Sequence, residues 1–162
     1  MRIIDIRRKT ARELITSSSL NVDISRLGSI KQARILILEK DYEVLIINNF
    51  PLIVFKKDHS IFFPYIESCN FFDSPDVTVD RGALPYILRG ADVMAPGIIS
   101  FSKFKTDDIV FVKCEGVPRV VAIAKALVDS EQLSNMKKGK VLENLHYVGD
   151  KIWKQVQKIF HK

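Results

Sequence analysis

The chain has 162 residues, 47% of them hydrophobic, and a formal net charge of +6. This length suits one ordinary domain or two small ones, and the composition provides enough apolar side chains for a packed core. Its apolar runs, such as residues 35–38 and 44–47, are far shorter than the roughly 20 residues that cross a bilayer, and residues 1–8 lack the apolar segment of a secretory signal. A soluble cytoplasmic protein with no membrane partner is therefore expected.

The charge and the cysteines narrow the classes of partner. The sequence pI near 9.3 favours polyanionic partners, and residues 74–162 carry 14 Lys and Arg against 10 Asp and Glu. Cys69 and Cys114 have no neighbouring Cys or His, so they cannot supply the four ligands of a structural zinc site. We expect two buried, reduced thiols and no metal.

Residues 7–20 predict a short amphipathic helix, in which Ala11, Leu14 and Ile15 form the apolar face. Basic side chains cluster at the start of this segment and are interpreted as a solvated helix face, with RNA contact as the alternative. These basic residues are Arg7, Arg8, Lys9 and Arg12.

The segments that follow predict an antiparallel meander. Residues 25–29 indicate a turn, and four β-branched or aromatic runs then alternate with polar turns. A short helix is expected over residues 64–70. Residues 73–76 are polar and interrupted by proline, so the first domain, of α/β character, is expected to end at residue 74. The expected strands are residues 32–39, 44–47, 52–55 and 61–63.

Residues 79–100 organise the second half. Asp80 is a helix N-cap residue type, and apolar residues then recur at helical spacing up to Leu88. Gly90 stands where a glycine ends a helix, and a short strand over 93–95 closes at the Pro96-Gly97 turn. Pro85 lies inside the expected helix and removes one backbone donor, which leaves the start of the helix open.

Short strands and one helix complete the second half. Strands are expected over residues 109–112, 120–127 and 141–148, with a turn at 149–150. Asp129 and Gln132 have the spacing of a capping box, so a helix is expected from Asp129 to Lys138, ending at Gly139. The expected fold class is α+β, with an N-terminal antiparallel sheet and helices followed by a small β barrel of mixed character.

Two motifs carry a resemblance to a known family. Asp-x-Gly-Ala at residues 80–83, followed by Ile-Leu-x-Gly-Ala-Asp-Val-Met-x-Pro-Gly-Ile at 87–98, looks like the opening of a PUA domain, a small RNA-binding pseudo-barrel. Residues 143–153 are similar to the end of that domain in a narrower group. That group contains the malignant-T-cell-amplified-sequence protein, ligatin and archaeal stand-alone relatives. The resemblance implies a PUA domain over residues 75–162, preceded by a pre-PUA domain over residues 1–74.

The resemblance also implies a site. In the family, RNA lies between the motif helix, the strand after it and the last strand. Small residues at Gly90 and Ala91 allow close approach of a phosphodiester backbone to main-chain N–H groups. Cations would supply attraction, and His146 and Tyr147 are candidates for stacking on an unpaired base, with a half-buried strand pair as the alternative. The candidate cations are Arg81, Arg89, Lys137, Lys138 and Lys140.

The sequence predicts a protein that is not an enzyme and needs no cofactor. The glycines fit neither a dinucleotide nor a P-loop spacing, and the only imaginable nucleophile and base, Cys114 with His146, are common types at unconstrained spacing. Trp153 is assigned to packing. The resemblance implies action on tRNA or the small ribosomal subunit, in initiation or recycling, with the density-regulated protein as a partner of eukaryotic members. The alternatives are a protein-interaction module and an accessory RNA-binding subunit of an RNA-modifying enzyme.

Overall fold

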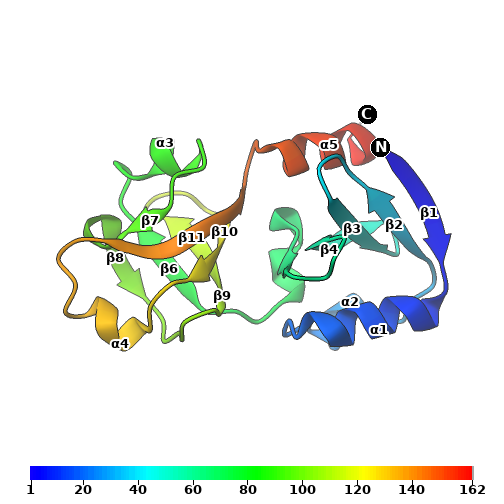
Figure 1. Ribbon diagram of the computed structural model, residues 1–162, viewed down its shortest axis with the longest axis horizontal. Coiled ribbons are helices and arrows are strands. Elements are labelled where there is room, and N and C mark those ends of the chain that lie inside the picture. Colours follow the sequence, from blue (N-terminus) through cyan, green and yellow to red (C-terminus); the bar gives the residue numbers. More distant parts are fainter. Residues whose placement is uncertain (162) are drawn as a thin grey trace. The chain divides into compact units, whose positions relative to one another are not determined.

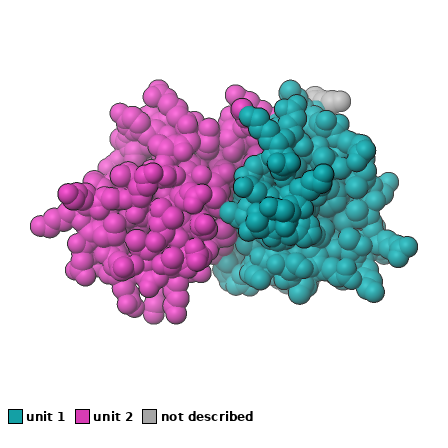
Figure 2. Space-filling view, in the orientation of Figure 1, with its two compact units in different colours: residues 1–73, 155–162 teal, residues 74–154 magenta. Residues whose placement is uncertain are grey.

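The computed structural model describes residues 1–161, which form two compact units (Figure 2). The first unit contains residues 1–73 and the C-terminal residues from 155 onward, and the second contains residues 74–154. The sequence places one boundary after residue 74 and assigns everything beyond it to the second domain. In the structure the chain returns to the first unit at its C-terminal end.

The first unit is built on an antiparallel sheet whose five strands follow chain order, β1-β2-β3-β4-β5 (Figure 1). The expected meander forms because each run buries one set of β-branched or aromatic side chains. β1 was not expected; it pairs with β2 from Arg2 opposite Ile37 to Ile6 opposite Ala33 and forms one edge of the sheet. The strands are β1 Arg2–Ile6, β2 Ala33–Ile37, β3 Tyr42–Ile47, β4 Phe50–Lys56 and β5 Phe62–Pro64.

Short helices accompany this sheet. The expected N-terminal helix forms as α1 (Arg8–Ser18), with Ala11 fully buried. A second helix, α2 (Ile24–Leu27), replaces the expected turn, because the Asp23 carboxylate accepts from the Ser25 N–H at 3.1 Å and caps the first turn. The short helix expected at 64–70 is the 3₁₀ segment η1 (Ile66–Phe71). No helix within residues 1–161 has the length and apolar character needed to span a membrane.

The second unit is built on a six-stranded mixed sheet of order β7-β11-β10-β9-β6-β8 (Figure 1). β6 runs parallel to β9, and the other neighbours are antiparallel. With its short helices this sheet is the pseudo-barrel that the sequence predicted. The strands are β6 Asp76–Val79, β7 Val93–Met94, β8 Ile98–Phe101, β9 Ile109–Cys114, β10 Val120–Ala126 and β11 Lys140–Tyr147.

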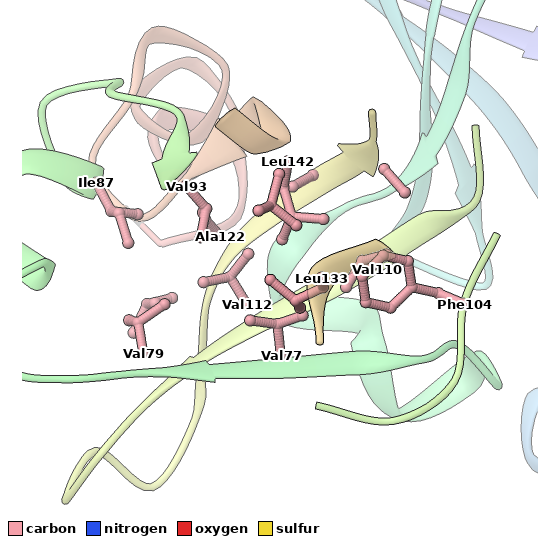
Figure 3. Packing of buried hydrophobic residues seen from close by; sticks show 14 of the residues in the cluster. Val77, Val79, Ile87, Val93, Phe104, Val110, Val112, Ala122, Leu133 and Leu142 are labelled. Atoms are coloured by element: carbon pink, nitrogen blue, oxygen red, sulfur yellow. The ribbon is translucent and has the colours of Figure 1, made fainter. Parts of the chain in front are cut away.

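Alternating residues of these strands build one apolar core (Figure 3). Val77 and Val79 of β6 and Val112 of β9 are fully buried, as expected for strands that present every second side chain to one face. Figure 3 shows Ile87, from the motif helix, pointing into the same interior as Val79. The motif helix is therefore anchored to the sheet through its apolar side.

Three α-helices remain within residues 1–161, two of one turn each and a longer one near the C-terminus. α3 is limited to Leu84–Ile87 and places Pro85 in its first turn, where the missing N–H has no intrahelical partner to lose. α4 (Ser130–Leu133) opens with the expected contact, from the Asp129 N–H to the Gln132 side chain at 3.0 Å. The expectation that it continues to Lys138 is wrong, because the helix ends at Leu133 and a turn and a bend follow within residues 134–139. α5 (Lys151–Phe160) was not expected.

Candidate functional site

The glycine corner after α3 is a Schellman helix end. Gly90 has a φ of 98°, which an L side chain rarely adopts. Its N–H donates to the Ile87 carbonyl at 3.0 Å, and the Ala91 N–H donates to the Tyr86 carbonyl at 3.0 Å. Both N–H groups are therefore used within the chain. The expectation that they donate to a ligand is wrong, although both residues are exposed.

Strand β11 holds this corner through Asn144. The Asn144 side-chain amide donates to the carbonyls of Ile87 and Ala91, each at 3.0 Å. The Asn144 N–H donates to the Asp92 carboxylate at 2.9 Å, and Lys140 pairs with the other oxygen of Asp92 at 3.2 Å. One strand thus satisfies the carbonyls at the end of α3 and places a cation beside it. The sequence marked Asn144 through the family motif but did not reveal this role, and it did not single out Asp92.

Tyr147, at the end of β11, lies against the corner from the core side. A Cβ added to Gly90 would lie 3.4 Å from Tyr147 Cε1 and 3.5 Å from its hydroxyl oxygen. The ring is partly buried and packs on the core of the second unit. It therefore supports the corner, and a side chain that extends beyond Cβ at residue 90 would press on it.

The five predicted cations occupy four different positions. Arg89 is exposed and immediately precedes Gly90. Lys137 and Lys138 are exposed in the turn before β11, and the Gly139 carbonyl of this turn accepts from the Ala95 N–H at 2.9 Å, which ties the turn to the end of β7. The other two predicted cations already have partners within the chain. Lys140 forms an ion pair with Asp92, and Arg81 donates to the Glu115 carbonyl at 3.3 Å, beside the β9–β10 turn.

His146 is fully buried, so no base can stack on its ring in this structure. Its Nδ1 lies 2.7 Å from the Asp150 carboxylate, and the same carboxylate accepts from the Tyr147 and Trp153 N–H groups at 3.0 and 2.7 Å. Asp150 therefore caps the first turn of α5 and also binds the last residue of β11. The prediction that His146 stacks on a base is therefore wrong, and His146 has a structural role.

Replacing Asp150 with alanine is expected to lower the free energy of unfolding by about 2–3 kcal/mol, since it removes a helix cap and the carboxylate next to a buried imidazole. Urea denaturation followed through Trp153, the only tryptophan, measures this change. The control Glu115→Ala removes an exposed turn carboxylate and should change the stability by less than about 0.5 kcal/mol. Equal stabilities of the two variants would contradict the role of Asp150.

An apolar hollow of about 580 Å³ lies beside the corner, between α3 and β7. Tyr86 and Met94 line it and are 63% and 43% exposed, so a ligand in the hollow can reach both side chains. Asp80 and Asp92 also line it. The sequence did not predict Tyr86 and Met94 as site residues. Tyr86 could have been identified because it precedes Ile87, the buried residue of a very short helix, and so points to a different side of that helix.

The alternative catalytic pair is not assembled. The Cys114 thiol is buried and lies 3.7 Å from the Asp80 carbonyl, and burial raises its pKa, which disfavours the nucleophilic thiolate. His146 lies on β11 opposite Ile123 of β10, whereas Cys114 ends β9. Residues 1–161 contain no group of three or more His, Cys, Asp or Glu side chains placed to hold a metal ion.

Comparison with known sequences identifies the second unit. The PUA domain matches residues 75–148. The uncharacterised protein MJ1432 of Methanocaldococcus jannaschii is 37% identical over 138 residues, which cover 82% of each chain. Translation machinery-associated protein 20 of Schizosaccharomyces pombe is 38% identical over 85 residues, 49% of this chain and 47% of its own. Malignant T-cell-amplified sequence 1 of Rattus norvegicus is 29% identical over 117 residues, 68% of this chain and 64% of its own.

Comparison with solved structures extends the match to both units. The hypothetical protein PH0734.1 from Pyrococcus horikoshii superposes with a TM-score of 0.79 at 30% identity, covering 96% of this chain and 99% of that chain. PH0734.1 thus matches nearly end to end and MJ1432 over 82% of its length, whereas the eukaryotic relatives match over about half to two thirds of theirs. The chain therefore belongs to the family of PUA-domain proteins that includes MJ1432 and is related to the malignant T-cell-amplified sequence proteins.

Proposed function

We propose that this protein is a non-catalytic RNA-binding protein of the cytoplasm, which acts on tRNA or the small ribosomal subunit during translation initiation or recycling. Its RNA site is the exposed face formed by the glycine corner, the hollow beside α3 and the cations that β11 brings to them. The name of its relative, translation machinery-associated protein 20, supports the process. The exposed glycine corner and the cations beside it support RNA as the ligand.

One observation carries the proposal: β11 joins the corner, through Asn144 and Asp92, to a chain segment rich in lysine. Phosphodiester backbones are held mainly by Lys and Arg, and the attraction does not require base contacts. Arg89 on one side of Gly90 and Lys137 and Lys138 in the turn beside β7 are exposed. Their ammonium and guanidinium groups are therefore available to phosphates at the corner.

The hollow gives the site a place for a nucleobase. Unpaired bases bind by stacking on aromatic faces, which contributes about 1–3 kcal/mol per base. Tyr86 offers an exposed ring at the rim of the hollow, and Met94 offers a flexible apolar surface on β7. We therefore assign to Tyr86 the stacking role that the sequence predicted for His146 and Tyr147.

The double variant Arg89→Glu, Lys138→Glu is expected to weaken tRNA binding at moderate salt by roughly tenfold or more, because two attractive charges become repulsive. Fluorescence anisotropy with labelled tRNA, at several salt concentrations, measures the affinity and its salt dependence. Circular dichroism establishes that the variant is folded.

Lys103→Glu, Lys105→Glu is the matched control, since it reverses two exposed cations of the same unit outside the corner and the hollow. It should retain most of the affinity. If both double variants lose affinity equally, binding depends on total charge and the proposed site is wrong. If the native chain binds no RNA but forms a nuclease-resistant protein complex, the protein-interaction function replaces this proposal.

A further inference from the structure

A second basic surface lies in the first unit, around the start of α1. We name it the α1 basic surface; its residues are Arg7, Arg8, Lys9, Arg12 and Lys31, all exposed. Within residues 1–161 none of the five side chains has a carboxylate partner, whereas Lys113 and Lys140 of the second unit pair with aspartates at 2.9 and 3.2 Å. The surface therefore has a concentrated positive charge that the chain itself does not neutralise.

This arrangement works against the stability of α1. The first turn contains no acidic residue, and Arg8 and Lys9 stand at the positive end of the helix dipole. Arg8 and Arg12 are four residues apart, so two like charges share one side of the helix. Each of these placements is unfavourable in the isolated chain and becomes favourable when an anion binds, which points to a binding role.

A hollow of about 390 Å³ lies at the same place, between the end of β1 and the start of β2. Arg7, Arg8 and Lys31 line it, together with the amide side chain of Gln32. Asp5 is the one acidic residue that lines it, and the cross-strand neighbour of Asp5 in the β1–β2 ladder is Arg34. The hollow is thus a concave, cationic part of the α1 basic surface.

We infer that the α1 basic surface binds the phosphodiester backbone of RNA, as a contact separate from the glycine corner of the second unit. This inference rests on the proposed RNA-binding function. Arginine guanidinium groups match phosphate oxygens with two parallel N–H donors, and three of the five cations are arginine. A protein partner would need an apolar centre, and residues 7–12 and 31–32 expose no large apolar side chain. The observations therefore favour a nucleic-acid backbone over an acidic protein.

The variant Arg8→Gln, Arg12→Gln tests the inference in the full chain, because glutamine retains helix propensity and hydrogen-bonding groups but removes both charges. Affinity for labelled tRNA is expected to fall roughly fivefold to tenfold at about 0.1 M salt, and the slope of log affinity against log salt to decrease by about 1.5. The thermal midpoint should equal or exceed that of the native chain, since the repulsion within α1 is relieved.

The matched control is Lys40→Gln, Lys57→Gln, which removes two exposed positive charges from the same unit. It should change tRNA affinity by less than about twofold. If the native chain binds tRNA and depends on Arg89 and Lys138, but the α1 variant binds equally well, the second contact is wrong and the corner stands. Loss of binding to polyglutamate with unchanged tRNA binding would identify an acidic protein surface instead and overturn the inference.

Discussion

Replacing Gly90 with valine is expected to lower the free energy of unfolding by about 3 kcal/mol and to reduce tRNA affinity roughly tenfold, equivalent to about 1.4 kcal/mol. The φ of 98° is strained for any L side chain. A Cβ at this position would be in van der Waals contact with the Tyr147 ring at 3.4 Å, so the two methyl groups that valine adds beyond Cβ are expected to displace that ring. Because Tyr147 ends β11, the displacement also disturbs the contact between β11 and the corner.

Gly149→Val separates these two effects. Gly149 has a φ of 92° in the same unit, but a Cβ there meets no atom within 4 Å. Its variant should lose only about 1–2 kcal/mol, the cost of backbone strain, and should bind tRNA nearly normally. Urea denaturation followed through Trp153 fluorescence measures both variants. If Gly149→Val is as destabilising as Gly90→Val, the Tyr147 contact has no role.

Replacing Asn144 with aspartate is expected to lower the free energy of unfolding by about 3–4 kcal/mol, although the side chain keeps its size. The change places a carboxylate oxygen where the amide now donates to the carbonyls of Ile87 and Ala91 at 3.0 Å. The new charge also lies close to Asp92, which accepts from the Asn144 N–H. Repulsion from three oxygen acceptors should detach β11 from the corner and weaken tRNA binding with it.

Two further variants test the cause. Asn144→Leu removes the donors without adding charge and should cost about 2 kcal/mol, less than the aspartate variant. Asn135→Asp introduces the same charge at an exposed turn residue and should be nearly neutral. A result in which Asn144→Leu is more harmful than Asn144→Asp would contradict repulsion as the dominant effect and indicate steric disruption.

The elements that local chemistry specifies were predicted well. The meander of the first unit follows from alternating apolar residues, and the end of the motif helix at Gly90 follows from the conformational freedom of glycine. β1 and α5 were missed because their apolar residues find partners elsewhere in the unit. Ile3 lies opposite Leu36 of β2, and the side-chain oxygen of Gln155 in α5 accepts a hydrogen bond from the Glu39 N–H at 3.1 Å.

The candidate site was predicted less completely, because its parts are joined across long separations in sequence. The motif located Gly90 and Ala91, and the charge pattern located the lysines before β11. Only the β7–β11 pairing explains why Lys140 meets Asp92. Burial, which the sequence does not specify residue by residue, decided that His146 is structural and that Tyr86 is exposed.

The amino-acid sequence alone thus determined the family, the α+β class and the position of the glycine corner, since these depend on short motifs and on local backbone preferences. The tertiary structure decided which polar groups remain available to a ligand. Hydrogen bonds within the chain already use the N–H groups of Gly90 and Ala91 and the ring of His146, while the cations at the start of α1 remain unpaired within residues 1–161. These hydrogen bonds are local in sequence, but the burial of His146 and the pairing of Lys140 with Asp92 require contacts between distant segments, which form only when the strands pair.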